Sequence, residues 1–382
     1  MNALSLRTVV AAAFGSLALA ACGGETAVAP PIAPPPEPVV TPPAPTTTAT
    51  AAAPPPDAGP PAAPAPPQLT AKGFPLPGAT GPVGYDYIVA ERARGRVWVP
   101  IGDTGSADVY DVAANAFARV DGFKTAEREI RGKKRLVGPS AVTIGDGFAY
   151  VGNRATSEVC AVDLKSLKLG KCLKLPVPTD GVAYVASTKE VWVTTPKDHS
   201  LTVLDASKPD TLKAKLVIKT EGEVEGYAVD ETRGLFFTNL EDKDKTLTID
   251  VKTHTVKATW SAGCGEAGPR GVVLDVARNQ VIVACTDKVE VLDGAHDGAV
   301  LSKLDTGAGV DNLDFVDATK LLYVAAGKAA KLSILKIDDK GQLTVVATAA
   351  TAEGSRNAVA DANGNAYVVD GQGGRLLVIP AP

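Results

Sequence analysis

Charged and amide side chains recur at a nearly constant spacing in the second half of the chain. Successive members lie 45, 45, 41 and 45 residues apart, and two of them are followed directly by an asparagine. Guanidinium groups bind carboxylates through two parallel hydrogen bonds, whereas carboxylate and amide oxygens hold hard cations such as Ca²⁺. The set therefore predicts a binding site for a polar group. Its members are Asp180, Glu225, Arg270, Asp311, Asn312, Arg356 and Asn357.

Short apolar segments that end in small or polar residues recur with the same spacing. Their side chains alternate with a period of two, β-branched residues are frequent, and Gly- or Asn-containing turns separate them from their neighbours. This pattern predicts strands throughout, and no convincing amphipathic helix follows residue 68. The segments are Val97–Val99, Tyr150–Asn153, Val191–Thr194, Phe236–Asn239, Val281–Ala284, Leu322–Ala325 and Ala366–Val369.

Seven repeated units account for residues 68–382. Their first strands open at Gly84, Ser140, Gly181, Gly226, Gly271, Asn312 and Asn357, and the average unit of 45 residues suits four strands. Such a count must close on itself, so we expect an all-β, seven-bladed β-propeller. The last unit supplies only three strands, and Gln68–Leu76 is the candidate for its missing outer strand, which removes an open edge.

The residue before each opening position should lie at the mouth of the central channel. Two interpretations of that ring remain open beside a self-satisfied set of ion pairs. In the first, the mouth binds a polar solute, a peptide or a carboxylate through Arg270 and Arg356. In the second, a divalent cation such as Ca²⁺ is held by Glu225, Asp311, Asn312 and Asn357, with Asp180 beside them. No cofactor is assigned with certainty.

Two family resemblances follow from these residues. Tyr150-Val151-Gly152-Asn153 and Phe236-Phe237-Thr238-Asn239, with third strands such as Val289–Asp293, resemble the bacterial YVTN-type seven-bladed propellers. That family includes periplasmic and surface binding proteins. The mouth residues are similar in part to the metal site of gluconolactonase-type propellers, which implies a metal that polarises a lactone carbonyl. The two arginines depart from that pattern, because they would repel a cation unless acids pair with them.

The amino-terminal residues predict export and lipid anchoring. Residues 1–21 combine a basic start with a short apolar run, and Leu19-Ala20-Ala21-Cys22 resembles the bacterial lipobox. The resemblance implies that Cys22 is acylated, and Gly23 favours the outer membrane, on its periplasmic or surface face. Residues 22–67 form a Pro/Ala/Thr-rich linker, and the stretch 25–67 holds 17 of the 29 prolines. This composition predicts an extended tether.

Four cysteines remain after Cys22, and four cysteines allow three pairings. Cys160 and Cys172 lie at equal distances from a turn near Ser166, so they should face each other. Cys264 and Cys285 should end strands of neighbouring blades on one propeller face. In an exported chain we favour the pairs Cys160–Cys172 and Cys264–Cys285, with free buried thiols as the alternative.

Charge and the remaining motifs limit the other functions. A net charge of −4 gives no reason to expect nucleic acid as a partner. His199, His254 and His296 are too scattered to form a zinc site or a catalytic triad. The window Lys124–Arg135 is an inserted basic loop, predicted on the mouth face, where it could meet an acidic partner, polymer or lipid. We therefore expect a monomeric, non-catalytic binding or scaffold propeller, with a metal-dependent lactonase-like hydrolase as the alternative. A quinone dehydrogenase lacks a suitably placed tryptophan.

Overall fold

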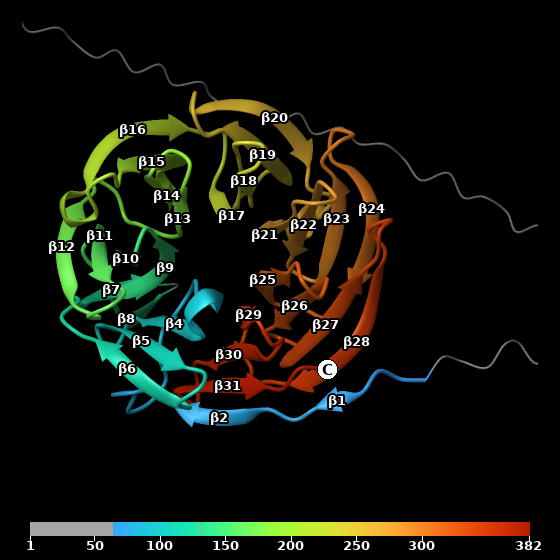
Figure 1. Cartoon of the computed structure of the whole chain (residues 1–382), viewed down its shortest axis with the longest axis horizontal. Coiled ribbons are helices and arrows are strands. Elements are labelled where there is room, and N and C mark those ends of the chain that lie inside the picture. The colour runs from blue at the N-terminus through green and yellow to red at the C-terminus, as the bar shows by residue number, and fades with distance from the viewer. Residues whose placement is uncertain (1–63, 131) are drawn as a thin grey trace, which may run out of the picture. The chain divides into compact units, whose positions relative to one another are not determined.

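The computed structural model describes residues 64–130 and 132–382. The predicted signal peptide, Cys22 and the linker as far as residue 63 lie outside the described residues. Seven sheets, each with four antiparallel strands and one with an added fifth strand, lie around a common axis, with their innermost strands at the centre and their outer strands at the rim (Figure 1). The prediction of an all-β, seven-bladed β-propeller is confirmed.

The first three blades are built from consecutive strands. Blade one contains β3 (Val89–Glu91), β4 (Arg96–Ile101), β5 (Ser106–Asp111) and β6 (Ala116–Val120). Blade two contains β9 (Pro139–Gly145), β10 (Phe148–Asn153), β11 (Glu158–Asp163) and β12 (Leu169–Lys174). Blade three contains β13 (Val182–Val185), β14 (Glu190–Thr195), β15 (Ser200–Asp205) and β16 (Lys213–Lys219).

The next three blades repeat the same order from the axis outwards. Blade four contains β17 (Val224–Asp230), β18 (Leu235–Leu240), β19 (Lys245–Asp250) and β20 (Thr255–Ser261). Blade five contains β21 (Pro269–Asp275), β22 (Gln280–Cys285), β23 (Lys288–Asp293) and β24 (Ala299–Asp305). Blade six contains β25 (Val310–Val316), β26 (Leu321–Ala326), β27 (Lys331–Ile337) and β28 (Leu343–Ala350).

Blade seven joins the two ends of the described chain. Its inner strands are β29 (Ala358–Ala360), β30 (Ala366–Asp370) and β31 (Arg375–Ile379), and β2 (Lys72–Pro75) pairs with β31 as the outer strand. The predicted closure is confirmed in this part. The proposed closing segment is nevertheless divided, because β1 (Gln68–Leu69) lies parallel to β28 as a fifth strand of blade six. The segment therefore covers the outer edges of two neighbouring blades.

Helical structure in the described residues is limited to single 3₁₀ turns. They are η1 (Arg92–Arg94), η2 (Pro196–Asp198), η3 (Pro209–Thr211) and η4 (Gly265–Ala267). None of the helices in the described part of the chain has the length and apolar character needed to cross a bilayer.

The hydrophobic core is divided into seven clusters, one between each pair of adjacent blades. Each cluster joins alternate side chains of one sheet to those of the next, as the period-two pattern requires. Trp98 and Trp192 are fully buried, and their indole N–H groups donate to Glu91 and Glu190 at 3.0 and 2.9 Å. Adjacent blades are therefore held together mainly by apolar packing between the facing surfaces of their sheets.

Both predicted disulfides are present. Cys160 and Cys172 lie directly opposite each other on β11 and β12, with their Cα atoms 4.0 Å apart. The Cys264–Cys285 bond links the segment after β20 to the end of β22, with a Cα separation of 5.3 Å. This second bond joins blade four to blade five.

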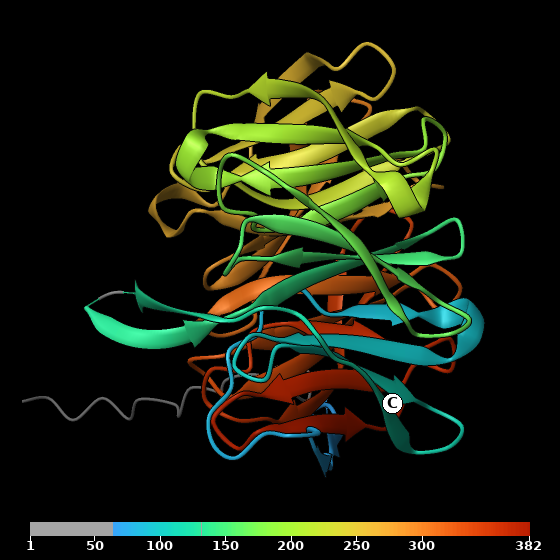
Figure 2. The same ribbon diagram turned by 90° about the vertical axis from the view of Figure 1, so that its left-hand side faces the viewer.

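The basic window between blades one and two is a β-hairpin, where the sequence suggested a loop. Strands β7 (Ala126–Ile130) and β8 (Lys133–Val137) pair only with each other among the described strands. Figure 2 shows this hairpin extending beyond the blades on one side of the propeller. Its base is fastened to blade two, because Arg128 donates to the Ala155 carbonyl and Asn153 to the Lys124 carbonyl.

We expect the Cys264→Ala/Cys285→Ala double variant to remain folded but to lose about 3 kcal/mol of unfolding free energy. The bond closes a loop with a sequence separation of 21 and ties two blades. Urea unfolding of the variant and of the unmodified protein, both without reducing agent, measures the loss. An unchanged midpoint in the variant would show that this bond does not stabilise the propeller.

Candidate functional site at the channel mouth

The sequence-predicted positions fall at the start of the innermost strands, around the mouth of the channel. Four of them lie five residues before the last residue of the strand: Asp180 before Val185, Glu225 before Asp230, Arg270 before Asp275 and Asp311 before Val316. Arg356 lies four residues before Ala360, the end of β29. Asp86 lies five residues before Glu91, the end of β3, and occupies the mouth in blade one. The sequence register had given that place to Val83, three residues too early.

Alternating charges run across the mouth over five blades. Asp86 stands in the middle, 2.6 Å from Arg154 Nη2 through Oδ2 and 3.1 Å from Arg356 Nη2 through Oδ1. Arg154 also binds Asp180, and Arg356 Nε binds Asp311. The resulting chain, Asp180–Arg154–Asp86–Arg356–Asp311, joins blades three, two, one, seven and six.

The pKa values of these acids differ with the number of guanidinium partners. Burial would raise the pKa of Asp86, but Arg356 and Arg154 outweigh it, so that the pKa lies below its usual range. Asp180 has one guanidinium partner, and burial raises its pKa to about 6. Burial likewise raises the pKa of Asp311 despite Arg356. Among these three acids, Asp86 is therefore the one that is firmly ionised.

Glu225 has no cationic partner among the described residues. Tyr87 reaches it from blade one and donates its hydroxyl to Oε1 at 2.6 Å, while the Gly226 N–H donates to the same hydroxyl at 3.2 Å. Burial, followed by the charges of Asp180 and Asp311, raises the pKa of Glu225 well above its usual value. Tyr87 also stacks on Tyr227, with ring centroids 5.2 Å apart, beside this carboxylate.

The third arginine of the mouth is already bound elsewhere. Arg270 pairs with Glu241, which follows β18 in blade four. Both arginines of the sequence prediction, Arg270 and Arg356, thus have acidic partners within the chain. Four carboxylates, those of Asp86, Asp180, Glu225 and Asp311, share only two guanidinium groups. The mouth therefore carries more acid than its own cations balance.

The two asparagines of the predicted metal set lie at the mouth, where some of their polar atoms already make hydrogen bonds. The Asn312 N–H donates to Asn357 Oδ1 at 3.2 Å, and Asn357 Nδ2 donates to the Asp86 carbonyl. Asn312 Nδ2 is buried and has no partner among the described residues. A cation at Glu225 and Asp311 would have to share the Asp311 carboxylate with Arg356, and the metal set stays a prediction.

Convergent metal-ligating groups of His, Cys, Asp and Glu in the described residues occur at Glu158, Cys160 and Cys172. The two sulfurs there form a disulfide. His199 and His296 lie in separate turns, as expected from the sequence. His254 is less isolated than expected, because its Nε2 lies 3.1 Å from both Glu190 oxygens and its ring stacks on Trp192.

Asp86, Tyr87, Arg154 and Glu241 are mouth residues that the sequence reasoning missed. Counting five residues back from the end of the first strand would have found Asp86, because the interval is the same in blades three to six. Arg154 and Glu241 follow second strands rather than preceding first strands, so the register gave no signal for them.

No family model and no curated protein sequence matches this chain. Solved structures match at the level of the backbone. A chain in the crystal structure of the mitotic checkpoint complex has a TM-score of 0.66 and 13% identity, over 88% of this chain and 99% of that one. A chain of the Kuenenia stuttgartiensis hydrazine synthase has a TM-score of 0.66 and 15% identity, over 79% and 97%. The structure of U3-55K gives 0.64 and 9%, over 81% and 98%.

At these identities the likeness concerns the fold alone. The class of protein is an all-β, seven-bladed β-propeller with an acid-rich channel mouth.

Replacing two mouth carboxylates by their amides should change stability in opposite directions at pH 8. Asp86→Asn removes the charge between two guanidiniums and should cost about 2 kcal/mol, a value reduced because both guanidiniums are about one-third exposed. Glu225→Gln keeps the acceptor for Tyr87 and removes an unbalanced charge, so it should stabilise by roughly 1 kcal/mol or more.

The pH dependence follows from the raised pKa of Glu225. The folded state holds this proton more tightly than the unfolded state, so ionisation lowers the stability of the unmodified protein as pH rises above about 4.5. The gain from Glu225→Gln should be absent at pH 4 and complete above the folded-state pKa. Thermal unfolding of both variants at pH 4 and 8 measures this, and a loss of stability in both variants at pH 8 would contradict it.

Proposed function

We propose that the protein is a lipid-anchored, non-catalytic binding propeller of the bacterial envelope, whose mouth receives a cationic group of a protein or polymer partner. The resemblance to YVTN-type binding proteins and the Leu19–Cys22 motif support the placement in the envelope. The observation that carries the binding function is the unbalanced carboxylate of Glu225.

Unpaired buried charge is unfavourable for a folded protein unless something supplies the missing partner. Burial raises the pKa of Asp180, Glu225 and Asp311, and neighbouring carboxylates of the mouth raise each pKa further, although each is an oxygen acceptor that a cation could bind. An ammonium or guanidinium group entering from the partner would ionise these acids and be held by them. Sites of this kind are often less stable without their ligand than with it.

The arrangement favours a cationic group over a carboxylate. Arg356 binds Asp86 and Asp311, and Arg270 binds Glu241, so an incoming carboxylate would have to displace acids that are already paired. The region around Glu225 lacks such a competitor among the described residues. A partner that presents lysine or arginine side chains therefore fits the mouth better than an acidic one.

Binding of a tetralysine peptide to the full-length chain in detergent tests the proposal. We expect saturable binding at pH 8 that falls at pH 4, where Glu225 is protonated, and that disappears in Glu225→Gln. Because Glu225→Gln should be the more stable protein, a lost signal cannot be ascribed to unfolding. Binding that is equal in the variant would place the cation elsewhere and overturn the assignment.

The same protein with Ca²⁺ in place of the peptide distinguishes the metal-dependent alternative. A specific site filled to about 100 times its dissociation constant adds roughly 2.7 kcal/mol of stability. A saturable rise with Ca²⁺, accompanied by lactone hydrolysis that Glu225→Gln abolishes, would replace the non-catalytic proposal by a lactonase-like hydrolase.

A further inference from the structure

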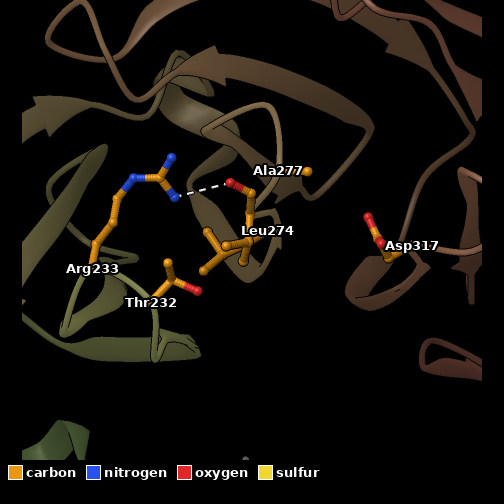
Figure 3. A pocket seen from close by; sticks show the side chains of 6 residues that line it. Thr232, Arg233, Leu274, Ala277 and Asp317 are labelled. Carbon is orange, nitrogen blue, oxygen red and sulfur yellow. Dashed lines mark hydrogen bonds between the residues drawn. The ribbon is translucent and has the colours of Figure 1, made fainter.

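A hollow of about 470 Å³ lies among the turns that join first to second strands in blades four, five and six (Figure 3). These turns are at the opposite ends of the innermost strands from the mouth, so the hollow is separate from the site described above. Its lining residues are Thr232, Arg233, Leu274, Val276, Ala277 and Asp317.

The Arg233 guanidinium is fixed at one wall of this hollow through a single nitrogen. Nη1 donates to Asp230 Oδ2 at 2.7 Å and to the Val276 carbonyl at 2.9 Å, the bond drawn as a dashed line in Figure 3. Asp230 Oδ1 also accepts the Arg233 backbone N–H at 2.9 Å. None of the described residues accepts a hydrogen bond from Nε or Nη2. The free edge of the guanidinium is therefore oriented before any ligand arrives.

The next blade repeats this turn and shows what the free edge can hold. Asp275 accepts the Arg278 backbone N–H at 3.2 Å and binds its Nη1 at 2.6 Å, as Asp230 does for Arg233. In that turn, however, Nε donates to Asp339 Oδ1 at 2.9 Å, and Nη2 binds the same carboxylate. The equivalent edge of Arg278 is thus occupied by a carboxylate of this chain, whereas the edge of Arg233 is not.

The other walls of the hollow limit the shape and charge of a ligand. Leu274 and Ala277 supply apolar surface between Arg233 and Asp317, which lie on opposite sides in Figure 3. Asp317 is 70% exposed, and one of its oxygens binds Lys320. No described residue binds its other oxygen, Oδ2, which can accept a hydrogen bond from an ammonium group. A volume of about 470 Å³ is within the usual range of about 300 to 1,000 Å³ for small-molecule sites.

We propose that this hollow binds a free aliphatic amino acid or short peptide, with the carboxylate on the Nε–Nη2 edge of Arg233. The ammonium group lies toward Asp317, and the aliphatic side chain covers Leu274 and Ala277. Arginine suits this role because its planar fork matches both carboxylate oxygens at once.

Titration of the full-length chain in detergent with three probes tests the proposal: L-leucine, L-leucinamide and 4-methylpentanoate. Leucine should bind saturably, and leucinamide, which lacks the carboxylate, should bind at least about tenfold more weakly. The acid without an ammonium group should bind more weakly than leucine. Calorimetry or ligand-observed NMR measures all three on unmodified protein, so these comparisons do not depend on any variant folding.

Arg233→Gln and Arg278→Gln form a matched pair of variants. The first should abolish leucine binding and the second should leave it unchanged, although both lose the same ion pair within their turn. Asp317→Asn should bring the affinity for leucine down to that for 4-methylpentanoate. Equal binding of leucine and leucinamide, or equal losses in the two arginine variants, would overturn the proposal.

Discussion

The position of Asp86 between two guanidinium groups is the constraint on which the channel mouth depends. Asp86 lies in the segment directly before β3, and it contacts Arg154 from one neighbouring blade and Arg356 from the other. The chain passes from β2, the outer strand of blade seven, to β3, the inner strand of blade one, so it connects these two blades covalently. The Asp86–Arg356 pair joins the same two blades at the mouth.

This closure makes the mouth electrostatically asymmetric. Alternating charges satisfy Asp86 fully and its neighbours Asp180 and Asp311 in part, whereas Glu225 receives only the Tyr87 hydroxyl. A purely structural ring would gain stability from an amide or an apolar side chain at position 225, because unbalanced charge in a covered site is unfavourable. The acid at position 225 therefore lowers the stability of the fold, and the cation that we propose a partner supplies would balance its charge.

The sequence predicted the fold well because the propeller is a local pattern repeated seven times. Strand alternation, turn residues and a spacing near 45 residues are each visible in the chain, and five mouth positions followed from one register. The register failed in blade one because Gly84 resembles the glycines that open other blades. In the structure, Tyr87 rather than Gly84 lies near the position of those glycines. Arg154 was missed because its contacts with Asp86 and Asp180 span 68 and 26 residues, and only the closed circle brings them together.

Repetition also shows how an equivalent position can change its role between blades. The turns after β17 and β21 place Asp230 with Arg233 and Asp275 with Arg278 in the same geometry. The loop between β27 and β28 adds Asp339 to the second turn, which becomes a closed ion-pair network. The first turn has no such partner among the described residues and borders a hollow. The backbone repeat fixes where the guanidinium lies, and the outer loop of the neighbouring blade decides whether its remaining edge is used within the chain.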